Sequence, residues 1–103
     1  MCMAEKEPFQ ALQEEFARER AQALGRIAGR MEGALADLRA CDEGVAPADG
    51  LTREDLAATA AEWVWYYVVQ RETMGWYRHE EALRFYGVPA EVVARMGPRR
   101  RHP

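Results

Sequence analysis

Residues 24–38, LGRIAGRMEGALADL, decide the fold because they carry two interleaved patterns. Large apolar side chains recur three or four residues apart, which is the spacing of one face of an α-helix. These side chains are Leu24, Ile27, Met31, Leu35 and Leu38. Glycines recur every fourth residue on the nearly opposite face, at Gly25, Gly29 and Gly33. The stretch therefore predicts a helix with one apolar face and one face of very small residues.

The helical pattern continues on both sides of this stretch, from Pro8 to Asp42. Pro8 stands where a first-turn proline is tolerated, and Phe9, Leu12 and Phe16 keep the helical spacing. A helix of about 30 residues is roughly 45 Å long, whereas a compact domain of this size has a radius of gyration of about 13 Å. The helix must therefore bend at its glycines, or another copy of the chain covers its exposed apolar face. We favour the second alternative and expect a homodimer.

The glycine face has two interpretations. A glycine inside a helix costs roughly 1 kcal/mol relative to alanine, so three of them suggest that another helix approaches the backbone closely. The alternative is a solvent-exposed face that tolerates weak helix formers, and the sequence leaves both open. The candidate interface residues are Gly25, Gly29, Gly33, Leu24, Ile27, Met31, Leu35, Leu38, Trp63 and Tyr67.

A second helix is predicted after the glycine- and proline-containing stretch 42–50. Thr52 resembles an N-cap, and Asp55 stands in for the usual Glu of a capping box. The helix runs through residues 56–69 toward Gly75, which either ends or bends it. Because its residues are apolar nearly all round, we expect it to be largely buried.

Two shorter helices are predicted next, His79 to Tyr86 and Ala90 to Met96, with Gly87 as the C-cap of the first. The predicted fold class is therefore all-α: a long N-terminal helix packed on a strongly apolar second helix, plus two short C-terminal helices. Residues 1–103 are expected to form a single helical domain, with disordered tails at 1–8 and 98–103.

Composition limits the function classes. The chain has 103 residues and a net charge of −3, which argues against the uniformly basic surface of a non-specific nucleic-acid binder. Its two cysteines, Cys2 and Cys41, form no CxxC or Cys/His spacing. The N-terminus lacks the pattern of a signal peptide, and no apolar run is long enough to span a bilayer. We expect a cytoplasmic protein with no membrane partner.

Chemical motifs are scarce. No catalytic triad, phosphate-binding loop or metal-ligand spacing is visible, and His79 lacks a second histidine at i+4. We therefore predict no catalytic residue, cofactor or metal, and do not expect an enzyme. The aromatic cluster of residues 63–69, with Trp76, Tyr77, Phe85 and Tyr86, favours core or interface over a ligand pocket.

Residues 79–101 have the outline of a helix-turn-helix, with Gly87 in the turn. Under this alternative the protein is a small nucleic-acid-binding regulator. Its phosphate contacts would be Arg95, Arg99, Arg100 and Arg101. Glu91 and the early stop at Gly97-Pro98 weigh against it, and a corner between two short helices is the simpler interpretation.

Two blocks carry a family resemblance: residues 19–26 continuing to 31–35, and residues 68–72 followed by 86–97. They resemble a family of small all-helical bacterial proteins classed as a domain of unknown function. The resemblance covers roughly Phe9 to Gly97 and implies the fold class but no activity. It points to Gln70, Arg71 and Glu72 as the first positions to inspect for a specific polar role. The sequence as a whole favours a helical structural or protein-interaction module that self-associates, with an unidentified protein as a further possible partner.

Overall fold

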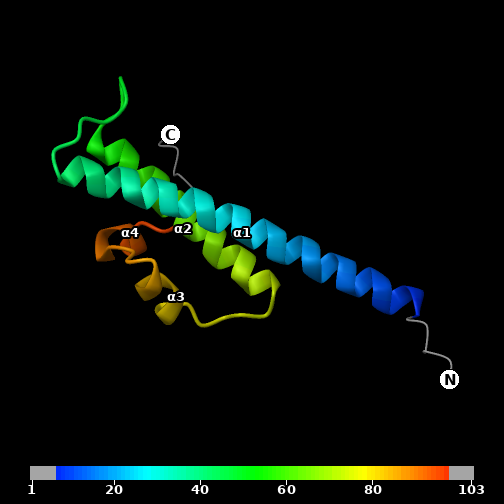
Figure 1. Ribbon diagram of the computed structural model, residues 1–103. Helices are drawn as coiled ribbons and strands as arrows, with labels where there is room; N and C mark the ends of the chain where they lie inside the picture. The colour runs from blue at the N-terminus through cyan, green and yellow to red at the C-terminus, as the bar shows by residue number, and fades with distance from the viewer. Residues whose placement is uncertain (1–6, 98–103) are drawn as a thin grey trace, which may run out of the picture.

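The computed structural model describes residues 7–97, which form the helices α1 (Pro8–Asp42), α2 (Arg53–Thr73), α3 (Glu80–Phe85) and α4 (Ala90–Ala94). Figure 1 shows α2 folding back along the second half of α1, with α3 and α4 beside α2. No strand occurs within residues 7–97, and the predicted all-α class is confirmed.

Helix α1 begins with Pro8 in its first turn and runs unbroken through all three glycines. Its 35 residues correspond to about 52 Å at 1.5 Å per residue. The helix ends at Asp42, with Arg39 in its last turn. The N–H of Glu43, the next residue, donates to the carbonyl oxygens of Arg39 and Ala40. Helix α1 is therefore much longer than α2, the helix that packs against it.

Helix α2 begins with the predicted capping box. The N–H of Asp55 donates to Thr52 Oγ1 at 3.1 Å, and the N–H of Thr52 donates to Asp55 Oδ2 at 2.9 Å. The helix ends at Thr73, because Gly75 adopts a left-handed φ of 84° and Trp76 N–H returns to the Arg71 carbonyl at 3.1 Å. Gly75 therefore ends the helix and does not bend it.

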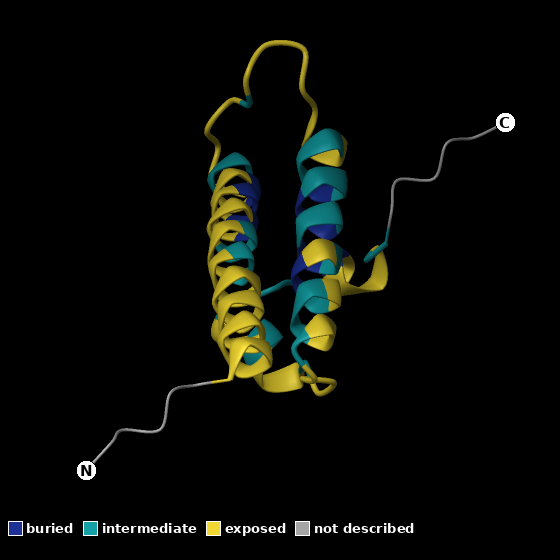
Figure 2. Ribbon diagram, turned by 90° about the vertical axis from the view of Figure 1, so that its right-hand side faces the viewer, coloured by how far each residue is buried: buried dark blue, intermediate teal, exposed yellow. Residues whose placement is uncertain are grey.

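The core lies between α1 and α2 and is closed at one side by α4 (Figure 2). Helix α1 contributes large side chains, whereas α2 contributes mainly alanines, and this combination lets the two backbones approach. The buried residues are Met31, Ala34, Leu35 and Leu38 of α1, Ala57, Ala60, Ala61, Val64 and Tyr67 of α2, and Val92 of α4. Burying each large apolar side chain contributes roughly 1.5–3 kcal/mol.

The two short helices differ in length from the prediction. Helix α3 spans Glu80–Phe85, with His79 and Tyr86 as its caps, and α4 ends at Ala94 instead of Met96. Tyr86 packs edge-on against Tyr67 with 5.4 Å between the ring centroids. Apart from Glu7 and Pro8, the predicted disordered tails lie outside the described residues.

Most residues of α2 are buried or half-buried, but one side of the helix is exposed. Its buried residues lie on the side that meets α1 and α4, and Tyr66 and Val69 are exposed on its other side. Trp63 and Trp65 are half-buried, and each packs on the Tyr66 ring. The expectation of a largely buried helix therefore holds except on this outer side, which no element within residues 7–97 covers.

The two helices of the hairpin do not match in length. Gln70, in the last turn of α2, donates a hydrogen bond from its side-chain amide to the Arg20 carbonyl at 3.2 Å, so this turn lies beside Arg20 of α1. Residues 8–19 of α1 extend beyond this point. The radius of gyration is 18.1 Å, against about 13 Å for a compact domain of this size. Figure 1 shows this extension as the blue part of α1.

The glycine face makes no close contact within the chain, so Gly29→Ala tests whether it is free. A Cβ added at Gly25, Gly29 or Gly33 meets nothing within 4 Å. Gly29→Ala should therefore raise the free energy of unfolding by about 0.5–1 kcal/mol, because alanine is the better helix former. Chemical denaturation measures this.

Gly75→Ala is the matched control and should destabilise the protein, because its left-handed φ disfavours a side chain. A loss of stability in Gly29→Ala would instead show that the glycine face is packed against another molecule.

Candidate interaction surface

Apolar side chains are exposed along the extension of α1. Phe9 is 67% exposed and Leu12 and Phe16 are each 46% exposed, and every residue from 7 to 22 is classed as exposed. We call Phe9, Leu12 and Phe16 the N-terminal row. Contiguous patches of exposed apolar side chains mark interaction sites, whereas single exposed apolar residues are ordinary.

The N-terminal row belongs to the same helix face as the core. Starting at Phe9, the three- and four-residue spacing continues through Arg20 to Leu24, Ile27 and Met31. Helix α2 covers this face from Leu24 onward, where burial increases until Met31 is fully buried. The row therefore continues the α1 side of the interface between α1 and α2, but no second helix covers it within residues 7–97.

Polar contacts hold the segment that follows α2 against the last turn of that helix. Arg71 donates from Nε to His79 Nδ1 at 3.2 Å and from its terminal nitrogen to the Arg78 carbonyl at 2.8 Å. Glu72 Oε2 lies 3.1 Å from His79 Nε2, so the contacts fit a neutral ring protonated on Nε2. With the Gln70 contact to α1, all three positions singled out by the resemblance make specific polar interactions.

Exposed aromatic side chains follow immediately after this end. The Arg71 guanidinium lies 5.4 Å from the ring of Trp76, which is 48% exposed, and Tyr77 is 71% exposed. The end of α2 therefore presents apolar surface close to the position on α1 where the uncovered face begins.

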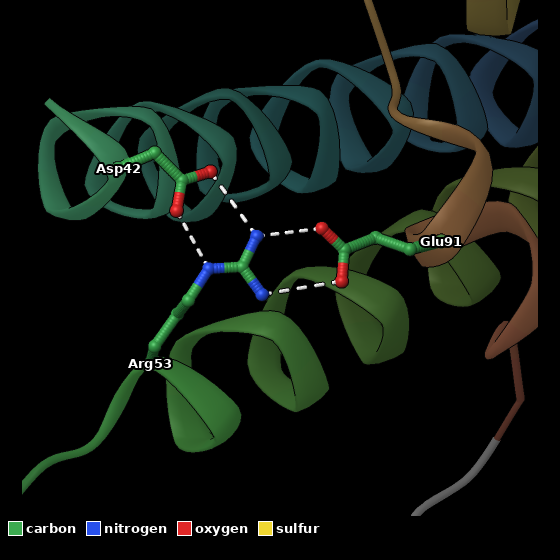
Figure 3. Close-up of polar contacts among 3 residues, drawn as sticks. All are labelled: Asp42, Arg53 and Glu91. Carbon is green, nitrogen blue, oxygen red and sulfur yellow. Dashed lines mark hydrogen bonds and ion pairs between the residues drawn. The ribbon is translucent and has the colours of Figure 1, made fainter.

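A charge cluster holds the opposite end of the hairpin (Figure 3). Arg53 donates to Asp42 at 2.6 and 3.1 Å and to Glu91 at 2.6 and 3.2 Å, so one guanidinium joins α1, α2 and α4. These hydrogen bonds hold the pKa of Asp42 and of Glu91 below its usual range and raise the pKa of Arg53. Sequence reasoning missed this cluster because its members are 11 and 38 residues apart, with no local signal.

The candidate interface residues fall into three groups. Met31, Leu35, Leu38 and Tyr67 are buried in the chain's own core, so they are not open to a second copy. Leu24, Ile27 and Trp63 are half-buried at the edge of that core, where Arg30 lies 5.9 Å from the Trp63 ring. Gly25, Gly29 and Gly33 are exposed. The N-terminal row was visible in the helical spacing, and the length of α1 predicted an uncovered part, but the sequence did not show which residues α2 leaves uncovered.

The helix-turn-helix residues are engaged within the chain. Arg95 forms an ion pair with Glu54 at 2.6 Å, and Glu91 binds Arg53. Arg99, Arg100 and Arg101 lie outside the described residues. Helix α4 has five residues and packs on α2 through Val92, so it is not presented as a recognition helix.

Other kinds of site find little support among residues 7–97. No group of three or more His, Cys, Asp or Glu side chains in this range is placed to hold a metal ion. An open hollow of about 580 Å³ includes Phe85 and Tyr86 of the aromatic residues, and it is lined by Glu32, Ala36, Arg39, Phe85, Tyr86 and Gly87. Burial and the neighbouring Tyr67 raise the pKa of Tyr86 there.

A search for membrane-crossing helices within residues 7–97 finds none of sufficient length and apolarity.

Fold and surface together define an all-α protein built on a helical hairpin whose first helix extends past its partner. The chain belongs to a family of proteins of unknown function, DUF6665, whose family model matches residues 4–103. The predicted resemblance to a domain of unknown function is thereby confirmed. Comparisons with curated proteins and with solved structures gave no match.

Removing the Arg53 guanidinium should make stability less dependent on acid pH. The pKa of Asp42 and that of Glu91 are lower in the folded chain than in the unfolded chain. Their contribution to the free energy of unfolding is therefore complete above the pKa of the unfolded chain, and it is lost as the pH falls through the lower folded-state values. Arg53→Gln should therefore be less stable than the parent at pH 7, and the difference should shrink below about pH 4.

Urea denaturation at a series of pH values measures this. Arg26→Gln, which removes an exposed arginine of α1, is the control and should show a smaller change. A stability difference between Arg53→Gln and the parent that stays constant from pH 7 to pH 3 would contradict the assignment.

Arg71→Lys should loosen the segment after α2 although it keeps the charge. Lysine cannot reproduce the planar contacts to His79 and the Arg78 carbonyl. We expect faster amide exchange over residues 76–79 and a loss of about 1–2 kcal/mol in the free energy of unfolding. Arg84→Lys on exposed α3 is the control, and equal exchange in both variants would show that the guanidinium does not fix this segment.

Proposed function

We propose that this protein is a small cytoplasmic, bacterial interaction module that self-associates through the N-terminal row of α1. The observation that carries the proposal is the exposure of Phe9, Leu12 and Phe16 on a helix face that α2 covers from Leu24 onward. An apolar face that continues an interface without its second helix favours a helical partner.

A second copy of the chain is the partner that best fits the surface. The row is continuous with the interface between α1 and α2, so a helix lying on it would meet the same kind of side chains. Another copy carries such a helix in its own extension, with its own apolar row to bury. The segment also mixes charges, with Glu15, Arg18, Glu19 and Arg20 beside the row, so two copies would not repel one another strongly.

The nucleic-acid alternative has no observation in its favour, since Arg95 and Glu91 are both held in ion pairs within the chain. The glycine face remains a proposal for a separate contact, which the Gly29→Ala variant tests. The proposed self-association depends neither on nucleic-acid binding nor on the glycine face.

Glutamate substitutions in the row should separate the copies. The parent chain should sediment at twice its mass of 11.7 kDa at micromolar concentration. Leu12→Glu with Phe16→Glu should give the monomer mass, because each places a charge in the contact. Sedimentation equilibrium measures this, and an unchanged circular dichroism melt at low concentration shows that the fold is intact.

Gln10→Glu adds a charge to the same segment away from the row and is the matched control, which should remain dimeric. If the parent chain stayed monomeric even when its concentration was raised to about 100 times micromolar, the proposal would be overturned.

A further inference from the structure

We infer that the two copies meet antiparallel, so that the extension of each α1 continues the line of the partner's α2. This inference rests on the proposed self-association and specifies its geometry. In this arrangement each α1 face is covered along its whole length, first by the chain's own α2 and then by the partner's extension.

The lengths fit this arrangement. The extension runs from Pro8, where α1 begins, to Arg20, whose carbonyl accepts a hydrogen bond from Gln70 in the last turn of α2. Two antiparallel extensions that overlap fully have their two-fold axis at the middle of this segment, beside Glu14. Pro8 of one copy then lies beside Arg20 of the other, next to the last turn of the α2 helix that covers the face beyond it.

The side chains of the row also match in this register. An antiparallel overlap centred on residue 14 places Leu12 of each copy opposite Phe16 of the other, on the two sides of the axis. The two exposed apolar side chains nearest the middle of the extension therefore cover each other. Phe9 of each copy lies toward the partner's α2 end, where Val69, Trp76 and Tyr77 are exposed.

The helix dipoles favour the same direction. Helix α2 runs opposite to α1 in the hairpin, as Figure 1 shows, so an antiparallel partner helix runs in the same direction as α2. The N-terminus of the partner's α1 then faces the C-terminal end of α2, which joins a partial positive to a partial negative charge.

A parallel pair lacks this fit. It would bring both α2 helices to the same end of the contact, where each already covers its own α1 from Leu24 onward. The two hairpins would have to splay apart there, and the exposed aromatic side chains after α2 would remain uncovered.

Distances between spin labels distinguish the two arrangements. In a chain carrying Cys2→Ser and Cys41→Ala, a nitroxide is attached either at Gln13→Cys or at Arg26→Cys, both exposed positions of α1. With the axis beside residue 14 and a rise of 1.5 Å per residue, the two labels at position 13 are offset by about 3 Å along the axis. The labels at position 26 are offset by about 36 Å.

Electron–electron double resonance should therefore give a short distance between the two labels at position 13. The distance between the two labels at position 26 should be at least 35 Å, which is roughly twice the distance at position 13 or more. A short distance at position 13 together with a distance well below about 35 Å at position 26 would show a parallel dimer and overturn this inference while leaving self-association intact. Sedimentation of each labelled chain establishes its mass. A monomeric parent would overturn the proposed function itself, and a dimer without a short distance at position 13 or at a replacement label on Gln10→Cys would place the contact elsewhere.

Discussion

Close packing of α1 on the alanine-rich face of α2 is the interaction on which the rest of the structure depends. Met31, Leu35 and Leu38 project from one helix onto a surface formed largely by Ala57, Ala60 and Ala61 of the other. Small residues allow the two axes to approach, so the large side chains are fully covered without a third full-length helix. Helix α4 closes the remaining side with Val92, and the Arg53 cluster joins the three helices at the loop end.

The difference in helix length follows from where α2 is stopped. Gly75 adopts a left-handed conformation, and Arg71 holds the chain after it through His79 and the Arg78 carbonyl. Helix α1 has no such stop, and its apolar spacing runs on to Phe9. The N-terminal row is thus a consequence of one helix ending before the other, and it gives the molecule a surface suited to a second helix.

Most of the fold was predictable from local signals. Pro8, the Thr52–Asp55 capping box and the helical spacing of apolar residues predicted α1 and the start of α2, because such signals act within a few residues. The exposure of Val69 on α2 was not predictable, since it depends on how many helices surround α2. Arg53 was also missed, because only the folded chain brings Asp42 and Glu91 to it. For the interaction surface, the sequence predicted an uncovered apolar face but placed it on residues that α2 covers.

Hydrogen exchange over residues 9–20 at increasing protein concentration is the direct test of self-association through the N-terminal row. Backbone amides of an isolated helical extension open readily, whereas those of a helix packed on a partner are protected in proportion to the bound fraction. We predict that protection of residues 9–20 rises with concentration, while that of the core segment 31–38 changes little. Exchange over residues 9–20 that is fast and independent of concentration would contradict self-association through this surface.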